Sequence, residues 1–126
     1  GGLLKSDAGD LIQEEFRALH RLRGEEGFSR VIYFGHQVLR GKESYVLIMP
    51  LLGSSVWDLF WETTNGRGLP AEKVITLGKQ MLVLLQRLHS KAIIHRDIKP
   101  ENFLMSGPGS QGHLCLIDMG LAQCLD

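Results

Sequence analysis

A helical pattern between Ala71 and Ser90 is the feature that most constrains the fold. Its apolar residues recur three and four positions apart, as on one face of an α-helix. They are Val74, Leu77, Met81, Leu84, Leu85 and Leu88. Gly78 lies inside the pattern and weakens a helix only modestly. The spacing therefore predicts one long amphipathic helix over residues 71–90.

Two short apolar segments after this helix predict a β-hairpin. They cover residues 103–105 and 113–117, and the loop between them, 106–112, holds three glycines and a proline. Glycine and proline in a short connection favour a reversal of the chain.

The first half of the chain opens with a second predicted helix. Asp10 is placed to cap a helix that runs to about Arg23, and Gly24 is placed to end it. Five apolar residues are expected on one face of this helix, namely Leu11, Ile12, Phe16, Leu19 and Leu22. The glycine-rich residues 1–9 before it are expected to be frayed.

A second hairpin is predicted after this helix. Strand patterns cover residues 30–37 and 44–49, with a turn at residues 40–42. Pro50 ends the second strand, because proline cannot donate a hydrogen bond within a central strand.

A brief helix is expected to follow the hairpin. Ser54 or Ser55 is placed to cap it, and it is expected to run through Trp61. Helix and hairpin thus follow one another twice along the chain. This order favours an α+β fold over a βαβ sheet.

Composition excludes several classes of protein. The formal net charge is zero, so there is no global basic field for nucleic-acid binding. The apolar runs 45–52 and 81–85 are too short to span a membrane, and no secretory signal is recognised. Cys115 and Cys124 form neither a disulfide framework nor a metal cluster. An intracellular protein, in the cytoplasm or nucleus, is expected.

The segment after the long helix carries the most informative motif. His95, Arg96 and Asp97 are followed by Lys99 and Asn102, and this pattern resembles the catalytic loop of protein kinases. Phosphoryl transfer needs mainly positioning and charge stabilisation from the protein.

The resemblance assigns a role to three residues of this loop. It implies that Asp97 orients the substrate hydroxyl and accepts its proton, and that Lys99 neutralises charge on the γ-phosphate. Asn102 is implied to bind a metal ion through its amide oxygen. Without this context, His95 suits a buried core position and Lys99 a solvated surface.

A second element follows the predicted hairpin. Asp118 leaves an apolar segment just before Met119 and Gly120. Mg²⁺ prefers oxygen donors, and a hairpin would return Asn102 and Asp118 to the same edge. An isolated Asp-x-Gly is a common turn. Its occurrence together with the catalytic-loop pattern favours a metal site.

Within the kinases, the chain resembles the casein kinase I group. The stretches 51–60, 88–91 and 101–105 carry this likeness, and the run 117–122 agrees with it. The cell-division-cycle kinase that fires replication origins shares parts of these stretches and is the rival assignment.

The resemblance also implies an ATP pocket. Glu15 matches the regulatory-helix glutamate that pairs with an ATP-anchoring lysine. Glu14 is the alternative, since helix periodicity lets only one of them face the site. Met49 is implied as the gatekeeper, Leu52 as a hinge residue whose backbone binds adenine, and Leu104 as the pocket floor. The glutamates also suit a solvated helix face, and the apolar residues a plain core.

Three departures from the family pattern are visible. Met119 stands where kinases usually have phenylalanine, and Pro50 replaces the acidic hinge residue. No glycine-rich loop and no strand with the anchoring lysine is recognised before Glu15; Lys5 lacks that context and lies close to the helix. No activation segment is recognised after Gly120.

These departures define the expected domain organisation. Residues 1–126 are expected to be the middle of a kinase domain. Residues 1–49 would form the remainder of its N-lobe, 50–53 the hinge and 54–126 the first part of its C-lobe.

The functional reading is a serine/threonine kinase fragment that uses ATP and Mg²⁺ and acts on protein hydroxyls. Lys99 favours serine and threonine over tyrosine, as the resemblance implies. The alternative is a pseudokinase or truncated module that binds partners without catalysis. A small-molecule kinase fits the run 99–102 less well.

Overall fold

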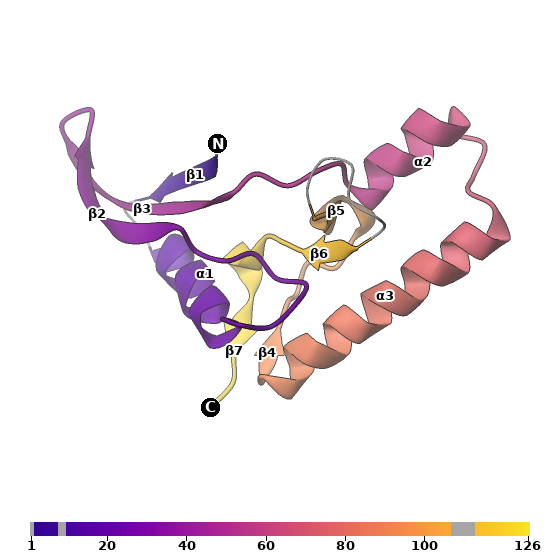
Figure 1. The fold of residues 1–126 in the computed structure, drawn as a ribbon. Coiled ribbons are helices and arrows are strands. Elements are labelled where there is room, and N and C mark those ends of the chain that lie inside the picture. Colours follow the sequence, from indigo (N-terminus) through magenta and orange to yellow (C-terminus); the bar gives the residue numbers. More distant parts are fainter. Residues whose placement is uncertain (1, 8–9, 107–112) are drawn as a thin grey trace.

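The computed structural model describes residues 2–7, 10–106 and 113–126. A three-stranded sheet and one helix form one part of the molecule (Figure 1). Two further helices and two short strand pairs form the other part (Figure 1). This mixture of helices and antiparallel strands confirms the α+β expectation.

The sheet is antiparallel throughout, with the strand order β1-β3-β2. Strand β2 covers Tyr33–Leu39 and β3 covers Lys42–Pro50. Arg40 and Gly41 join them with φ angles of 50° and 76°. Two positive φ angles are typical of the tight turns that match the twist of a hairpin. The predicted hairpin is therefore confirmed, with shifted boundaries.

Strand β1, Gly2–Asp7, was not predicted. It pairs with β3 over its whole length, with Lys5 opposite Leu47 and Leu3 opposite Met49. The expected fraying is therefore wrong for residues 2–7. The reason is non-local, because the backbone of β1 is satisfied by a strand some forty residues later in the chain. Residues 1 and 8–9 lie outside the described residues.

Helix α1, Asp10–Arg21, confirms the first predicted helix. Ile12, Leu19 and Leu22 are buried as expected, but Leu11 is 60% exposed. Leu11 is one position, or about 100°, away from Ile12 around the helix, which turns it to solvent.

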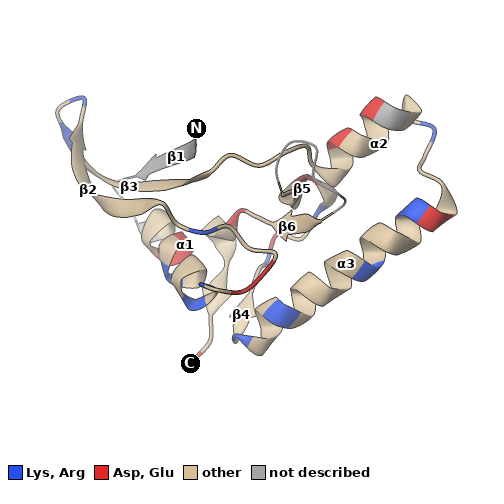
Figure 2. Cartoon of the chain, in the orientation of Figure 1, with Lys and Arg blue, Asp and Glu red and all other residues tan. Residues whose placement is uncertain are grey.

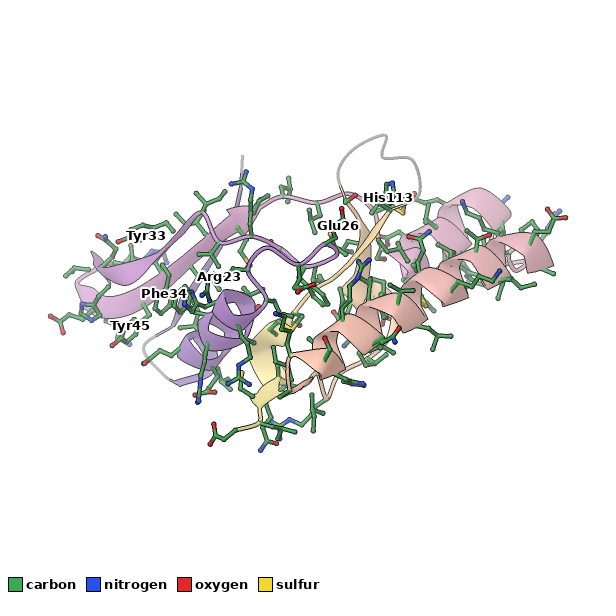
Figure 3. The ribbon with its side chains drawn as sticks, turned by 60° about the horizontal axis from the view of Figure 1, so that its bottom comes forward. Arg23, Glu26, Tyr33, Phe34, Tyr45 and His113 are labelled. Carbon is green, nitrogen blue, oxygen red and sulfur yellow. The ribbon has the colours of Figure 1, made fainter. Side chains whose placement is uncertain are left out.

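An aromatic stack joins α1 to the sheet. The Phe16 ring lies 4.1 Å from that of Phe34, with 5° between their planes. Phe34 in turn stacks on Tyr45, and Figure 3 shows these two side chains together on the sheet.

Helices α2 and α3 follow β3. Helix α2 covers Val56–Thr64, and Ser55, one of the two predicted caps, forms a capping box with Asp58. Helix α3 covers Ala71–Ser90, as predicted. Leu77, Leu84 and Leu88 are its buried residues, whereas Val74, at the start of the same apolar pattern, is 53% exposed.

Short elements fill the space between α1 and α3. Strand β5, Phe103–Met105, pairs with β6, Leu114–Leu116, which confirms the second predicted hairpin. Most of the loop between them lies outside the described residues. Strand β4, Ile93–Ile94, pairs with β7, Gln123–Cys124. Two 3-10 turns, η1 at Pro100–Asn102 and η2 at Met119–Leu121, complete the chain.

The core is continuous between the two parts. Its fully covered residues include Leu47 from β3, Leu88 from α3, Leu116 from β6 and Met119 from η2. Among the described residues, no helix is both long and apolar enough to cross a membrane.

Candidate active site

His95 anchors the loop that follows β4. Its side chain is 1% exposed, its Nε2 lies 2.7 Å from the carbonyl oxygen of Ile117, and its Nδ1 accepts a hydrogen bond of 3.1 Å from the Asp97 amide. Because Nδ1 accepts, Nε2 carries the proton and donates to Ile117. A neutral histidine thus ties the loop to the end of β6.

Asp97, Lys99 and Asn102 form one bonded cluster. Lys99 Nζ lies 3.6 Å from Asp97 Oδ2. Asn102 Nδ2 donates to the Asp97 carbonyl at 2.8 Å and to Asp97 Oδ2 at 3.3 Å. The structure therefore brings together the three residues predicted from the catalytic-loop motif. The Asp97 side chain is 29% exposed, so its carboxylate remains reachable from solvent.

Asp118 is placed by a strained turn directly after β6. Its φ angle of 60° is in the left-handed region of backbone conformation, which residues other than glycine rarely adopt. Its Oδ1 accepts a hydrogen bond of 3.3 Å from the Gly120 amide. A Cβ atom at Gly120 would lie 3.1 Å from Asp118 Oδ1, so glycine leaves room for the carboxylate. The neighbouring Ile117 amide donates to the Asn102 carbonyl at 2.8 Å, which joins Asp118 to the catalytic-loop cluster.

Glu15, rather than Glu14, faces this site. Glu15 is 4% exposed, and its Oε2 accepts a hydrogen bond of 3.2 Å from the Met119 amide. Glu14 lies exposed on the outer side of α1. The alternative left open by the sequence is thereby resolved in favour of Glu15.

A cavity of about 400 Å³ lies between the sheet, α1 and β5. All five residues predicted to contact the nucleotide line it, namely Glu15, Met49, Leu52, Leu104 and Asp118. Its walls are tied together by main-chain bonds. The Gly53 amide donates to Met105 and the Met105 amide donates to Ser54, both at 2.8 Å. These bonds hold the connector after β3 against β5, and so Leu52 against Leu104.

Sequence reasoning missed other parts of the cavity wall. Leu19, Ser29 and Ile117 also line it. Ile117 had a usable signal, because it directly precedes Asp118. Leu19 and Ser29 had none, because only the packing of α1 and its following turn brings them to the cavity.

The oxygen donors of the site suit a magnesium ion. Asn102 is 5% exposed and uses its amide nitrogen for Asp97. Its Oδ1 has no hydrogen-bond partner in the part of the chain that the structure describes. A buried amide oxygen and a nearby carboxylate are ligands that Mg²⁺ accepts alongside water and phosphate. Among the described residues, no group of three or more His, Cys, Asp or Glu side chains is arranged to hold a metal ion.

Cys115 is a buried residue of β6. Burial raises the pKa of its thiol, which favours the neutral form. Cys115 and Cys124 are both free thiols.

Comparisons with known proteins identify the family of the chain. A family model described as the protein kinase domain matches residues 4–126. The casein kinase 1-like protein HD16 of Oryza sativa subsp. japonica is 40% identical over 110 residues, which are 86% of this chain and 15% of that protein. Casein kinase I homolog 2 of Schizosaccharomyces pombe is 38% identical over 122 residues, which are 94% of this chain and 26% of that protein. The chain therefore spans about a quarter or less of the length of these relatives.

Proposed function

We propose, since the chain belongs to the protein kinase domain family and its relatives include casein kinases I, that the domain containing these residues phosphorylates proteins. The reaction is transfer of the γ-phosphate of ATP to serine and threonine hydroxyls. One observation carries the proposal: the Asp97–Lys99–Asn102 cluster is joined through Ile117 to the cavity that holds Asp118 and Glu15.

Asp97 is the residue placed to act on the acceptor. Its carboxylate is reachable from solvent, and Asn102 and the His95-anchored backbone fix its position. It orients the acceptor hydroxyl and accepts its proton as the oxygen attacks the γ-phosphorus, while the bond from that phosphorus to the bridging oxygen breaks and ADP leaves. Lys99, beside Asp97, neutralises charge on the phosphoryl group as it passes to the acceptor.

Asn102 Oδ1 and the Asp118 carboxylate are the proposed metal ligands. Protein kinases in general use ATP with Mg²⁺, which neutralises charge on the phosphates. Gly120 and the Met119–Glu15 bond keep the Asp118 backbone in its left-handed conformation. Rigid support of this kind lowers the cost of ordering a ligand side chain.

The cavity is the proposed adenine site, and residues 50–53 the proposed hinge. Met49 closes its back, Leu104 forms its floor, and the main chain around Leu52 offers hydrogen bonds to the base. Pro50 has no amide proton, so the adenine contacts fall to the residues after it. A mostly apolar cavity with a few polar groups at one end is typical of nucleotide sites.

We propose Lys5 as the residue that anchors the phosphates of ATP. The sequence alone does not assign this role to Lys5. Residues directly opposite in an antiparallel ladder belong to the same face of the sheet. Lys5 lies opposite Leu47 and Leu3 opposite Met49, so Lys5 shares the face that carries the cavity residue Met49. Buried Glu15 lies on α1, which packs against this sheet. The family match begins at Leu4 and so includes this position.

A phosphotransfer assay tests the proposal. Casein, after which these relatives are named, serves as acceptor, with radiolabelled ATP and Mg²⁺. We expect incorporation on serine and threonine that Asp97→Asn lowers at least about a hundredfold. Asp126→Asn is the control, because the Asp126 side chain is 96% exposed and pairs with Arg17 on α1. ATP binding without any incorporation would instead favour the alternative, a non-catalytic kinase-like module.

A further inference from the structure

A second cavity, of about 680 Å³, lies along α3 and shares no lining residue with the proposed nucleotide cavity. It runs between α3, the turn after α1 and the β5–β6 hairpin, and we call it the α3 groove. Six of its residues carry the argument below. They are Lys79, Val83 and Arg87 from α3, Glu26 from the turn, and His113 and Leu114 from the hairpin.

Hydrogen bonds between its three walls hold the α3 groove open. Arg87 Nη1 donates to the Glu26 carbonyl at 3.1 Å, and Gln80 Oε1 accepts from the Leu114 amide at 3.1 Å. Gly27, with a φ angle of 93°, leaves no room for a side chain, because a Cβ atom there would lie 1.9 Å from Leu84 Cδ2. These contacts fix the three walls of the groove relative to one another.

The α3 groove has an apolar floor and a largely cationic rim. Leu84 and Leu114 are buried beneath it, and Val83 is 42% exposed within it. No carboxylate of the described residues lies within ion-pair distance of Lys79 or Arg87. Figure 2 shows lysine and arginine spaced along α3. Glu26 and His113, from the other two walls, are labelled in Figure 3. Glu26 is the one acidic residue of the lining.

The spacing of these residues defines a ligand pattern. Lys79, Val83 and Arg87 follow at four-residue intervals on one face of α3, so the two cations lie about 12 Å apart with Val83 midway. An extended peptide advances about 3.3 Å per residue, so residues about four positions apart in the peptide span this length. Alternate side chains of such a peptide point the same way.

We propose that the α3 groove binds an extended segment of a partner protein with the pattern acidic-x-apolar-x-acidic. The two carboxylates pair with Lys79 and Arg87, and the apolar side chain between them covers Val83. Charge complementarity selects a peptide of this kind over a basic one, and the apolar floor selects it over a purely polar one. The surface lies outside the phosphotransfer machinery and so adds a docking function to it.

A fluorescein-labelled peptide containing Glu-Ala-Leu-Ala-Glu tests this proposal by anisotropy, titrated with the 126-residue chain. Lys79→Glu reverses one contact and is expected to weaken binding about tenfold. Val83→Ser is expected to weaken it about threefold, through loss of apolar burial. Lys73→Glu makes the same charge change on the same helix outside the groove and is expected to leave affinity unchanged.

Three results would overturn the proposal. The first is that Lys73→Glu weakens binding as much as Lys79→Glu does. The second is that a Lys-Ala-Leu-Ala-Lys peptide binds as tightly as the acidic peptide. The third is that Val83→Ser leaves the affinity unchanged while inorganic polyphosphate competes fully with the peptide. The last would identify a patch for polyanions. Melting temperatures of the variants check that each is folded. The titration contains no nucleotide, so its failure would leave the proposed kinase function untouched.

Discussion

Glu15 and Met119 are joined by a hydrogen bond of 3.2 Å, from the Met119 amide to Glu15 Oε2, although they lie 104 positions apart in the chain. The bond couples α1 to the turn that presents Asp118. Since Met119 is fully buried, the turn cannot shift without disturbing the core. The position of α1 and the position of the proposed metal ligand are therefore set together.

Glu15→Gln should weaken this coupling. The substitution replaces a charged acceptor by a neutral one, which costs about 1 kcal/mol of hydrogen-bond energy, and also removes a charge from the cavity. We expect phosphotransfer to fall at least about tenfold in the radiolabel assay. Glu14→Gln is the matched control, because Glu14 is exposed on the same helix. Equal activities of the two variants would contradict the role given to Glu15.

Lys5→Met should weaken binding of ATP at the proposed phosphate anchor. Loss of a cation beside the phosphates predicts an affinity for Mg²⁺-ATP lowered by about tenfold or more, measured by calorimetry. Lys42→Met is the control, since Lys42 is an exposed residue at the far end of β3. If both variants bind ATP like the unmodified chain, Lys5 is not the anchor.

Leu88→Ala should destabilise the fold through a cavity in its core. Leu88 is 0% exposed, and truncation of such a leucine costs about 2–5 kcal/mol of unfolding free energy. Leu82→Ala on the same helix should change it by less than about 0.5 kcal/mol, because Leu82 is 68% exposed. Urea denaturation of both variants measures the difference. Similar losses would mean that the two faces of α3 are assigned incorrectly.

Local patterns predicted much of the fold. Helix α3, the β5–β6 hairpin and the Ser55 cap follow from short stretches whose own spacing or chemistry encodes the element. The same pattern includes Val74, which is exposed, because periodicity indicates an apolar face but not how far the neighbouring elements extend along it.

What depends on distant contacts could not be predicted in this way. Strand β1 forms because its backbone pairs with that of β3. Taken alone, residues 2–7 predict a frayed terminus. Helix periodicity predicted that only one of Glu14 and Glu15 faces the site. The packing of α1 against η2 shows that the buried one is Glu15. The cavity is also lined by Leu19 and Ser29, and nothing in the sequence pattern assigns these two residues to a cavity.

The most direct measurement of the central claim is the melting temperature of this chain with ATP, with and without Mg²⁺. A ligand that binds only the folded state raises the melting temperature, by an amount that grows with its concentration. We expect a Mg²⁺-dependent rise with ATP that Asp118→Asn abolishes and Asp126→Asn retains. A folded chain that shows no such rise, or one that Asp118→Asn leaves intact, would contradict a metal-nucleotide site built from Asn102 and Asp118.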